Sequence, residues 1–257
     1  MLKDKIALVS GGGTGIGRAI AFKLAKNGAK VAIASRNRDQ LNRVADELTQ
    51  LGLTVQPVPM NIRIKADVER AVADVVSQWG AIHILVNNAG ISGLSRMNDA
   101  DDSKWYEIVD TNLHGMYLLT KAVLRHMPDQ AGGRVINISS VLGKFGVPGY
   151  TAYCTTKHGM IGFGRALALE IVSRGITVNT ICPGWVDTEM ATQGINETAK
   201  SLGIPPEEFK AQAVAAVPIR RFLAAEEIAE LVAYVASDAA RGITGQAMNI
   251  CGGQTMV

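Results

Sequence analysis

The stretch Ser10-Gly11-Gly12-Gly13-Thr14-Gly15-Ile16-Gly17 follows an apolar run at residues 5–9 and leads into a helical stripe of Ile16, Ile20 and Leu24. The glycines at positions 11, 15 and 17 permit a tight turn, and their missing Cβ atoms let a pyrophosphate approach the backbone. The N-terminus of the following helix supplies unpaired N–H groups and a partial positive charge. The stretch therefore predicts a dinucleotide-binding loop rather than a plain glycine-rich turn. The residues expected to contact the dinucleotide are Gly11, Gly13, Thr14, Gly15, Ile16 and Gly17.

The alternation of strand and helix patterns continues along the whole chain. Further apolar runs predict strands at 31–34, 53–58, 82–86, 135–138, 176–181 and 247–250. Helical periodicity is found at 38–51, 65–79, 103–127, 151–173 and 225–237. Strands that alternate with helices predict a parallel sheet that is covered on both faces. We expect an α/β fold with a doubly wound sheet of about seven strands, in one domain that spans residues 1–257.

Residues 190–218 interrupt this alternation between the sixth strand and the last helix. A connection of this length inside a compact domain is usually a lid or a binding loop. Ligand crevices in such sheets lie at the carboxyl ends of the strands. We therefore expect a substrate lid here, with a surface helical insertion as the alternative. The apolar residues of the segment suit a bulky or acyl substrate, and they are Met190, Ile195, Leu202, Phe209 and Val214.

The end of the second strand indicates which dinucleotide is bound. An Asp or Glu at this place would accept a hydrogen bond from the ribose 2′-OH and repel a 2′-phosphate. The chain instead has Ser35-Arg36-Asn37-Arg38, and a guanidinium suits a phosphate. NADP(H) is therefore favoured over NAD(H), with Ser35 and Arg36 as contacts. The alternative is that Arg36 and Arg38 are only solvated.

Tyr153 and Lys157 are four residues apart in a predicted helix, which places both side chains on one face. An ammonium close to a phenol favours the phenolate. We therefore expect the pKa of Tyr153 to fall by roughly two to three units, which would suit acid–base catalysis near neutral pH. The alternative is a half-buried tyrosine beside a lysine whose alkyl chain covers apolar surface.

The composition excludes several classes of protein. Apolar residues make up 47% of the chain and charged residues 19%, and the net charge of +3 comes from interspersed acids and bases. This balance is typical of a globular domain and argues against a dedicated nucleic-acid binder. The three cysteines are far apart and form no metal-ligand spacing, so we expect reduced thiols and no metal. No run of about 18 apolar residues is present, so we expect no membrane span, no signal peptide and a cytoplasmic location.

Further short motifs follow the predicted strands in order. They are Asn87-Asn88-Ala89-Gly90 after the fourth strand, Asn112 in the long helix, Ser139-Ser140 after the fifth strand and Pro183-Gly184 after the sixth. With the glycine loop and the Tyr153–Lys157 pair, they make the chain resemble the short-chain dehydrogenase/reductase family over essentially its whole length. Within the family, the chain is most similar to the β-ketoacyl-carrier-protein reductases and the aromatic polyketide ketoreductases. The stretches 151–159, 179–184, 190–218 and 249–253 are closest to the polyketide branch.

The resemblance implies a Rossmann-type sheet and a role for each matching catalytic residue. Tyr153 is expected to be the general acid in ketone reduction, and Lys157 to bind the nicotinamide ribose and lower the tyrosine pKa. Ser140, thirteen residues before Tyr153, is expected to hydrogen-bond the substrate carbonyl, whereas Ser139 closes the strand. Asn112 is expected to hold a helix kink and a water that feeds protons through Lys157. Its alternative role is to cap neighbouring backbone.

The resemblance also implies further contacts with the dinucleotide. Thr188 is expected to contact the carboxamide of the nicotinamide. Asn61 stands where the family often has an Asp that holds the adenine, and its amide oxygen can still accept from the adenine amino group. The remaining expected contacts are Ile62, Asn88, Ala89, Gly90, Pro183, Gly184 and Val186.

Two departures from the family pattern bear on partners and catalysis. His83 stands where an acid is often found, and we expect it to support a loop rather than to act in catalysis. Fatty-acid reductases dock a carrier protein through basic residues on two central helices. Arg174 matches one of these residues, but the other region, residues 128–131, is not basic. Carrier-protein delivery is therefore in doubt, and the resemblance implies a homotetramer built through the same two helices.

These features together predict an NADPH-dependent ketoreductase that acts on a 3-oxoacyl thioester or a polyketide-like cyclic ketone. One alternative is an NAD(P)-dependent secondary alcohol dehydrogenase that works oxidatively on a small alcohol. Another is a non-catalytic NADP-binding regulatory protein. Such proteins tend to lose the catalytic tyrosine or lysine, and this chain has both residues.

Overall fold

A parallel seven-stranded sheet runs through the computed structural model, which describes residues 2–257. The strand order is β3-β2-β1-β4-β5-β6-β7, so the sheet grows outward in both directions from β1 and β4. This doubly wound arrangement confirms the predicted α/β fold. The strands are β1 (Ile6–Ser10), β2 (Lys30–Ser35), β3 (Val55–Pro59), β4 (Ile84–Asn87), β5 (Arg134–Ile138), β6 (Thr177–Pro183) and β7 (Ala247–Ile250).

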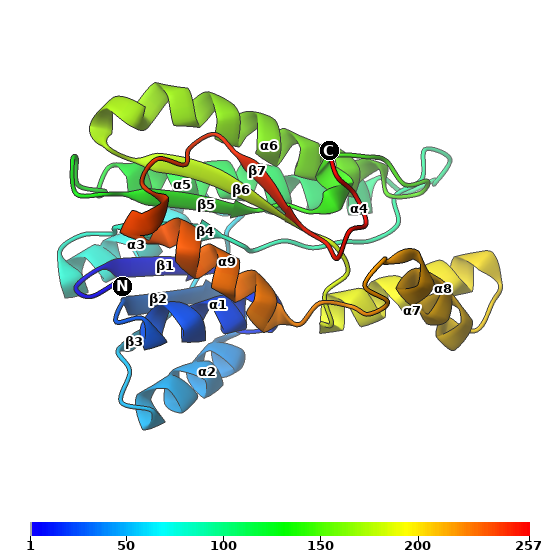
Figure 1. The fold of residues 1–257 in the computed structure, drawn as a ribbon, viewed down its shortest axis with the longest axis horizontal. Helices are drawn as coiled ribbons and strands as arrows, with labels where there is room; N and C mark the ends of the chain where they lie inside the picture. The colour runs from blue at the N-terminus through cyan, green and yellow to red at the C-terminus, as the bar shows by residue number, and fades with distance from the viewer. Residues whose placement is uncertain (1) are drawn as a thin grey trace.

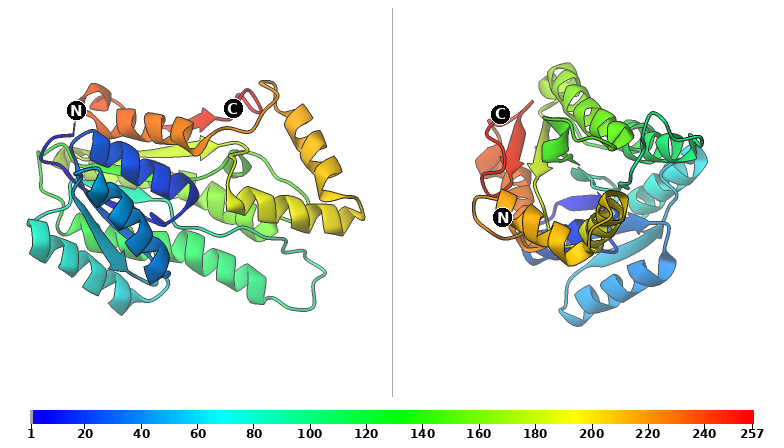
Figure 2. Two further views of the ribbon diagram at one scale, coloured as in Figure 1. Left: turned by 90° about the horizontal axis from the view of Figure 1, so that it is seen from below. Right: turned by 90° about the vertical axis from the view of Figure 1, so that its right-hand side faces the viewer.

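Helices cover both faces of this sheet (Figures 1 and 2). One core joins the sheet to α1, α2 and α9, and the other joins it to α3, α5 and α6. The helices are α1 (Gly15–Lys26), α2 (Arg38–Gln50), α3 (Lys65–Trp79), α4 (Ser103–Val109), α5 (Gly115–Leu124), α6 (Thr151–Ile171), α7 (Glu189–Leu202), α8 (Pro206–Ala216) and α9 (Ala225–Ala236).

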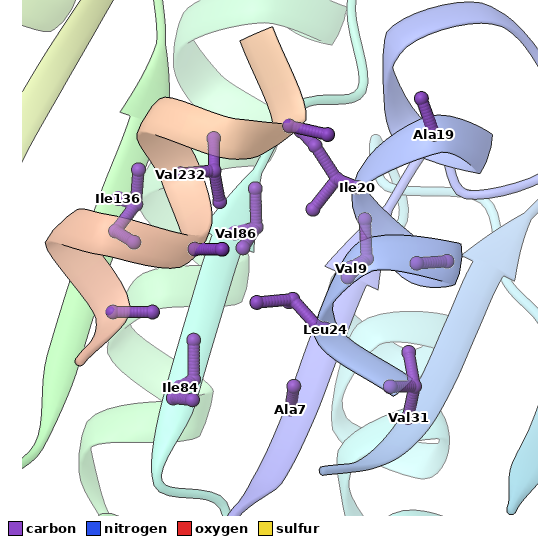
Figure 3. Packing of buried hydrophobic residues seen from close by; sticks show 14 of the residues in the cluster. Ala7, Val9, Ala19, Ile20, Leu24, Val31, Ile84, Val86, Ile136 and Val232 are labelled. Atoms are coloured by element: carbon purple, nitrogen blue, oxygen red, sulfur yellow. The ribbon is translucent and has the colours of Figure 1, made fainter. Parts of the chain in front are cut away.

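Strand β1 shows why the sequences of the central strands are unbroken runs of mostly apolar residues. All five of its residues are buried. Ala7 and Val9 pack into the core under α1 and α9, as Figure 3 shows, whereas Ile6 and Leu8 enter the core on the opposite face. A strand that is buried on both faces has apolar side chains at almost every position. Its sequence therefore does not alternate between apolar and polar residues.

The long helix predicted at 103–127 is divided in the structure. A π-helical turn at Asp110–His114 separates α4 from α5, and α5 ends at Leu124. The inserted residue turns the Asn112 amide inward, where it bonds the backbone of Ile91. At the earlier end, the distant Arg174 guanidinium donates to the carbonyl oxygens of Leu124 and Met127. Apolar periodicity does not reveal either feature.

Strand β3 lies at an edge of the sheet, where it pairs only with β2. Its predicted range was 53–58, and the observed strand includes Pro57 and Pro59. Proline has no N–H to donate, so prolines within a strand are tolerated where one side of the ladder is unpaired.

The segment after β6 forms two helices, α7 and α8, which extend past the carboxyl ends of the strands (Figures 1 and 2). The two ends of this segment lie together. Leu223 donates its N–H to Trp185 over 2.9 Å and accepts from the Asp187 N–H over 2.9 Å. The rings of Trp185 and Phe222 stack with their centroids 5.2 Å apart. The chain therefore leaves the sheet and returns to it at the same place, and α7 and α8 lie between these two points.

Within residues 2–257, no helix is both long enough and apolar enough to cross a bilayer. The same residues contain no group of three or more His, Cys, Asp or Glu side chains that could hold a metal ion. Cys154, Cys182 and Cys251 are all buried as free thiols.

Candidate active site

The predicted site residues come from loops at the carboxyl ends of parallel strands. The glycine loop follows β1, Ser35 ends β2, Asn88 follows β4, Ser140 follows β5 and Gly184 follows β6. Strand order reverses between β1 and β4, and a crevice forms at such a switch point. A cavity of about 230 Å³ lies at this edge.

Ser140 and Tyr153 form the polar end of this cavity. Both residues line it, and their side chains are hydrogen-bonded to each other. The Ser140 Oγ also accepts from the Leu142 N–H over 3.1 Å, at the start of a 3₁₀ turn at Val141–Gly143. Tyr153 projects from the first turn of α6. The two hydroxyls are therefore positioned by different elements and converge on one point.

Ser139 has a different environment from Ser140. Its hydroxyl is buried and donates to the carbonyl oxygen of Lys157 over 2.9 Å. This bond fastens the end of β5 to α6, in agreement with the expectation that Ser139 closes the strand.

Lys157 lies one turn beyond Tyr153 on α6, and its side chain is only 4% exposed. Its Nζ donates to the carbonyl oxygen of Ile138 over 2.9 Å and is 5.4 Å from the centroid of the Tyr153 ring. Burial lowers the pKa of Lys157 to about 8. The ammonium therefore remains predominantly protonated at neutral pH, beside the phenol ring.

The predicted fall in the Tyr153 pKa is wrong for the ligand-free protein. Burial raises the pKa of the phenol to about 12, although the hydrogen bond with Ser140 acts in the opposite direction. The cause is desolvation, which disfavours the charged form more strongly than the nearby polar groups favour it. The Tyr153 hydroxyl consequently keeps its proton near neutral pH and presents a hydrogen-bond donor to the cavity.

Asn112 lies in the π-helical turn and is fully buried. Its Oδ1 accepts from the Ile91 N–H over 2.8 Å, and its Nδ2 donates to the Ile91 carbonyl oxygen over 2.9 Å and to the Thr156 Oγ1 over 3.2 Å. A Cβ placed on Gly90 would meet both Asn112 Oδ1 and Lys157 Nζ within 4 Å. The side chain thus caps neighbouring backbone, which was the alternative role considered from the sequence, and it does so in the π-helical turn next to Lys157.

The glycine loop has the shape that a bound pyrophosphate requires. Gly11 and Gly15 have positive φ angles of 68° and 50°. A Cβ on Gly17 would lie 2.1 Å from the Gly11 carbonyl oxygen, so only glycine fits there. Thr14 precedes α1 without making a side-chain cap, and the first turn of α1 contains no acidic residue. The N–H groups at this helix end are therefore available to an anion, and the loop fits a dinucleotide.

Asn88 holds the glycine loop in place. Its side-chain amide donates to the carbonyl oxygens of Ser10 and Gly11, over 3.0 and 3.2 Å. The Ser10 hydroxyl in turn accepts from the backbone N–H groups of Asn88 and Ala89. Asn88 was predicted as a direct cofactor contact. In the ligand-free structure its side-chain amide instead bonds the backbone of the glycine loop.

The predicted nucleotide-specificity residues lie beside the loop. Arg36 is exposed and makes no ion pair or hydrogen bond within residues 2–257. A Cβ on Gly13 would lie 3.6 Å from the Ser35 Oγ, so the end of β2 borders the glycine loop. Asn61 accepts from the Arg63 N–H, and Ile62 packs its buried side chain near Gly115.

The loop after β6 meets the glycine loop from the other side of the cavity. Pro183, Gly184, Val186, Thr188 and Ile16 all line the cavity. A Cβ on Gly15 would lie 3.4 Å from the Thr188 Cγ2. The structure thus brings the predicted carboxamide-binding segment together with the dinucleotide loop.

Several cavity residues were not predicted from the sequence. The wall contains the apolar side chains of Val141, Leu142, Phe145, Val147 and Trp185, together with Tyr150, Thr198 and Gln254. No local motif marks them, because they lie on loops and helices that meet only in the fold. Of the apolar residues predicted for the lid, Met190 and Phe209 line the cavity, Ile195 is buried and Leu202 is exposed.

His83 lies at the opposite end of β4 from the cavity. Its Nδ1 accepts from the Ile6 N–H over 3.2 Å. Burial lowers its pKa, and the Lys5 ammonium acts in the same direction. This position agrees with a supporting role and not with catalysis.

A profile of the short chain dehydrogenase family matches residues 5–199. The chain is 38% identical over 252 residues to a putative ketoacyl reductase of Streptomyces coelicolor, which covers 97% of each chain. It is 39% identical over 255 residues to the 3-oxoacyl-acyl-carrier-protein reductase of Escherichia coli K12, which covers 99% of each. The solved structure of a single-substitution variant of actinorhodin polyketide ketoreductase with NADPH superposes with a TM-score of 0.93, at 37% identity and 99% coverage of both chains.

Proposed function

The chain belongs to the short-chain dehydrogenase family, and from this membership and the cavity geometry we propose that it is an NADPH-dependent ketoreductase. It reduces a 3-oxoacyl thioester or a polyketide-like cyclic ketone to a secondary alcohol, with Tyr153 as the general acid. The observation that carries the proposal is the pair of bonded hydroxyls, Ser140 and Tyr153, in an otherwise mainly apolar cavity beside the buried Lys157.

The proposed cofactor site extends from the glycine loop to Lys157. The loop and the N-terminus of α1 hold the pyrophosphate, Arg36 pairs with the 2′-phosphate, and Lys157 binds the nicotinamide ribose. When bound, NADPH supplies the hydride. Relatives named as ketoreductases, including one solved with NADPH, support the choice of cofactor. The remaining proposed contacts are Ser35, Asn61, Ile62, Asn88, Ala89, Gly90, Pro183, Gly184, Val186 and Thr188.

The hydroxyls of Ser140 and Tyr153 stabilise the carbonyl oxygen as negative charge develops on it. On substrate binding the bond between the two hydroxyls is exchanged, so that each donates to the carbonyl oxygen. Their side chains are already placed by the 3₁₀ turn and by α6, so little further reorganisation is needed during the reaction. Tyr153 then transfers its proton to this oxygen, which leaves a phenolate. The Lys157 ammonium stabilises that phenolate, and Asn112 holds the kink and the water through which the proton is replaced.

The relatives named as ketoacyl reductases, 3-oxoacyl reductases and ketoreductases support reduction as the direction of the reaction. The Tyr153 phenol, whose pKa burial raises to about 12 in the ligand-free protein, holds a proton that it can donate to the substrate oxygen. The secondary alcohol dehydrogenase considered from the sequence would use the same residues in the reverse direction.

Helices α7 and α8 form the proposed substrate lid. Met190, Ala191, Gly194 and Thr198 of α7 and Phe209 of α8 line the cavity. A mainly apolar wall suits the carbon skeleton of an acyl or cyclic substrate, and the hydroxyl pair fixes its carbonyl.

Delivery by a carrier protein has weaker support. Arg174, the residue that matches a docking position, bonds Asp129 over 2.6 Å and also donates to two backbone carbonyls. These bonds engage its guanidinium within the protein.

The proposed assembly is a homotetramer formed through α5 and α6. Tyr117 on α5 is 42% exposed, Leu169 on α6 is 82% exposed, and Val172 just after α6 is 49% exposed. Large apolar side chains at such exposure favour a covered surface. Mass measurement in solution tests the stoichiometry.

A test of the proposed function is NADPH absorbance decay with a panel of β-ketoacyl thioesters and cyclic ketones. We expect NADPH consumption with at least one class, and a smaller rate with NADH. Activity confined to alcohol oxidation by NADP⁺ would favour the dehydrogenase. Tight NADPH binding without turnover of any ketone or alcohol would favour a regulatory protein.

A further inference from the structure

Gln254 differs from the other polar side chains of the cavity wall in its hydrogen bonding. Its Oε1 is buried and has no hydrogen-bond partner within residues 2–257. No other polar side chain of the cavity wall has such a buried, unpaired atom in that range. The hydroxyls that already have partners belong to Ser139, Ser140, Tyr150, Tyr153, Thr188 and Thr198.

The Gln254 side chain is directed to the backbone at the end of β6. A Cβ added to Gly184 would lie 2.9 Å from the Gln254 Oε1, so the glycine leaves the room that the amide occupies. Gly184 also lines the cavity. The unpaired acceptor therefore lies beside Gly184, just behind the surface of the cavity wall.

The segment that carries Gln254 is fixed on its first side by two glycines. Gly252 and Gly253 have φ angles of 62° and 87°. A Cβ on Gly252 would lie 2.6 Å from the Ile219 side chain, and the Gly252 carbonyl oxygen accepts from the Ile219 N–H over 3.2 Å. This tight turn packs against the chain that leaves α8.

The same segment is fixed on its second side by Lys144 and Asn249. The Lys144 Nζ donates to the carbonyl oxygens of Val257, over 2.6 Å, and Ala247, over 2.8 Å. The Asn249 Nδ2 donates to the Val257 carbonyl oxygen over 2.9 Å. Lys144 directly follows the 3₁₀ turn that orients Ser140. Gln254 is thus held in a fixed relation to the carbonyl-binding hydroxyl.

We propose that Gln254 determines substrate specificity by accepting a hydrogen bond from a hydroxyl group of the substrate. The proposal rests on the ketoreductase function and narrows it to ketones that carry a second, hydrogen-bonding oxygen. Hydroxylated cyclic ketones are favoured over their unsubstituted parents.

The physical basis is the cost of an unpaired buried acceptor. Gln254 is half-buried and lines the cavity, so its amide can turn toward a substrate. A substrate hydroxyl that pairs with Oε1 satisfies an acceptor that is closed to water in the ligand-free protein, whereas an unsubstituted ketone leaves it without a partner. Sites of this kind reject the analogue that lacks the bonding group. The bonds described above fix the backbone of this segment, so the Gln254 amide turns toward a substrate from a constant position.

The test uses calorimetric binding of α-tetralone and its singly ring-hydroxylated analogues to the enzyme–NADP⁺ complex. The oxidised cofactor prevents turnover, so affinity is measured at equilibrium. We expect at least one hydroxylated analogue to bind roughly 10-fold more tightly than the parent ketone, as one net hydrogen bond allows. Gln254→Met, which keeps the shape of the side chain, should remove this preference and leave NADP⁺ affinity unchanged.

Two further variants sharpen the result. Gln254→Glu keeps an acceptor at this place and should retain the preference for the hydroxylated ketone. Gln50→Met, on the exposed end of α2, is the matched control and should behave as the wild type.

Three results would overturn the inference. They are equal affinity of the wild type for all the ketones, a preference that survives in Gln254→Met, and a loss of NADP⁺ affinity in that variant, which would mean that Gln254 reads the cofactor. Failure of the wild type to bind any ketone would also remove the proposed function. The two failures are distinguishable because the first three results leave ketone binding intact.

Discussion

At position 153, desolvation of the phenol outweighs the hydrogen bond with Ser140, which acts to lower the pKa. The sequence shows the spacing of Tyr153 and Lys157, and from spacing alone an acidic phenol is the natural expectation. The folded chain buries both groups, which raises the pKa of the tyrosine to about 12 and lowers the pKa of the lysine to about 8. Burial depends on which elements close over α6, and no local sequence pattern records that.

Lys157 predicts how the stability of the ligand-free protein changes with pH. Its pKa is lowered by burial from the ordinary 10.5 to about 8. Between these values the unfolded chain keeps a proton that the folded chain has released, so the free energy of unfolding rises with pH. Below about pH 8 both states hold the proton, and the full cost of burying the charge remains.

We expect Lys157→Met to lack this rise when urea unfolding is measured across the window from about pH 8 to pH 10.5. Lys26→Met, at an exposed position of α1, should keep it. Parallel pH curves for the wild type and Lys157→Met would show that Lys157 does not titrate as the structure indicates.

Arg36 predicts the choice between the two dinucleotides. Its guanidinium is exposed beside the glycine loop without a partner in residues 2–257, so a 2′-phosphate can pair with it. Arg36→Asp should weaken NADPH binding by roughly 10- to 100-fold and leave NADH binding nearly unchanged or improved. Fluorescence titration with both cofactors measures this, with Arg43→Asp on α2 as the control. Equal losses for the two cofactors would mean that Arg36 does not read the 2′-phosphate.

At the scale of the element, regular structure was predictable and deviations were not. The strands at 135–138 and 247–250 and the helix at 65–79 agree closely with the observed β5, β7 and α3. The π-helical turn at Asp110–His114 adds one residue to an otherwise ordinary stripe, and its cause is the distant backbone of Ile91. For residues 190–218 the sequence predicted a lid, with a surface helical insertion as the alternative. The segment forms two helices, and both contribute to the cavity wall.

A pair of hydroxyls joins helix α7 to the start of α6 at the cavity, and a hydrogen bond from Arg96 to Ser201 ties the far end of α7 to another segment. The Tyr150 hydroxyl and the Thr198 Oγ1 are 2.8 Å apart, and Tyr150 is buried at the start of α6. Thr198→Val keeps the shape of the side chain and leaves the Tyr150 hydroxyl without this partner. We expect the KM for the ketone to rise roughly 3- to 10-fold, with little change in NADPH affinity.

Steady-state kinetics measures that effect, with Thr192→Val as the control. Thr192 lies on the same helix, and its exposed hydroxyl bonds only the Thr188 carbonyl oxygen. A KM that rises equally in both variants, or in neither, would contradict the proposed role of the Tyr150–Thr198 contact.

At the scale of the whole molecule, the sheet was predictable because strand and helix patterns alternate from end to end. The residues proposed for catalysis could be singled out from the sequence, because Ser140 follows a strand and Tyr153 lies one turn from Lys157. The wall of the cavity was not found. Gln254, Phe145 and Thr198 come from segments far apart in the chain, and only the fold brings them together.

The central claim is that the Tyr153 hydroxyl, fixed by Ser140 and backed by Lys157, protonates the substrate oxygen. Tyr153→Phe removes one oxygen atom and preserves the ring in the cavity wall. The most direct measurement is single-turnover reduction of an accepted ketone by this variant with NADPH prebound, alongside Tyr106→Phe at an exposed position of α4. We predict a rate at least about 100-fold below the wild type for Tyr153→Phe, with unchanged NADPH affinity. A rate near that of the wild type would contradict the assignment of Tyr153 as the proton donor.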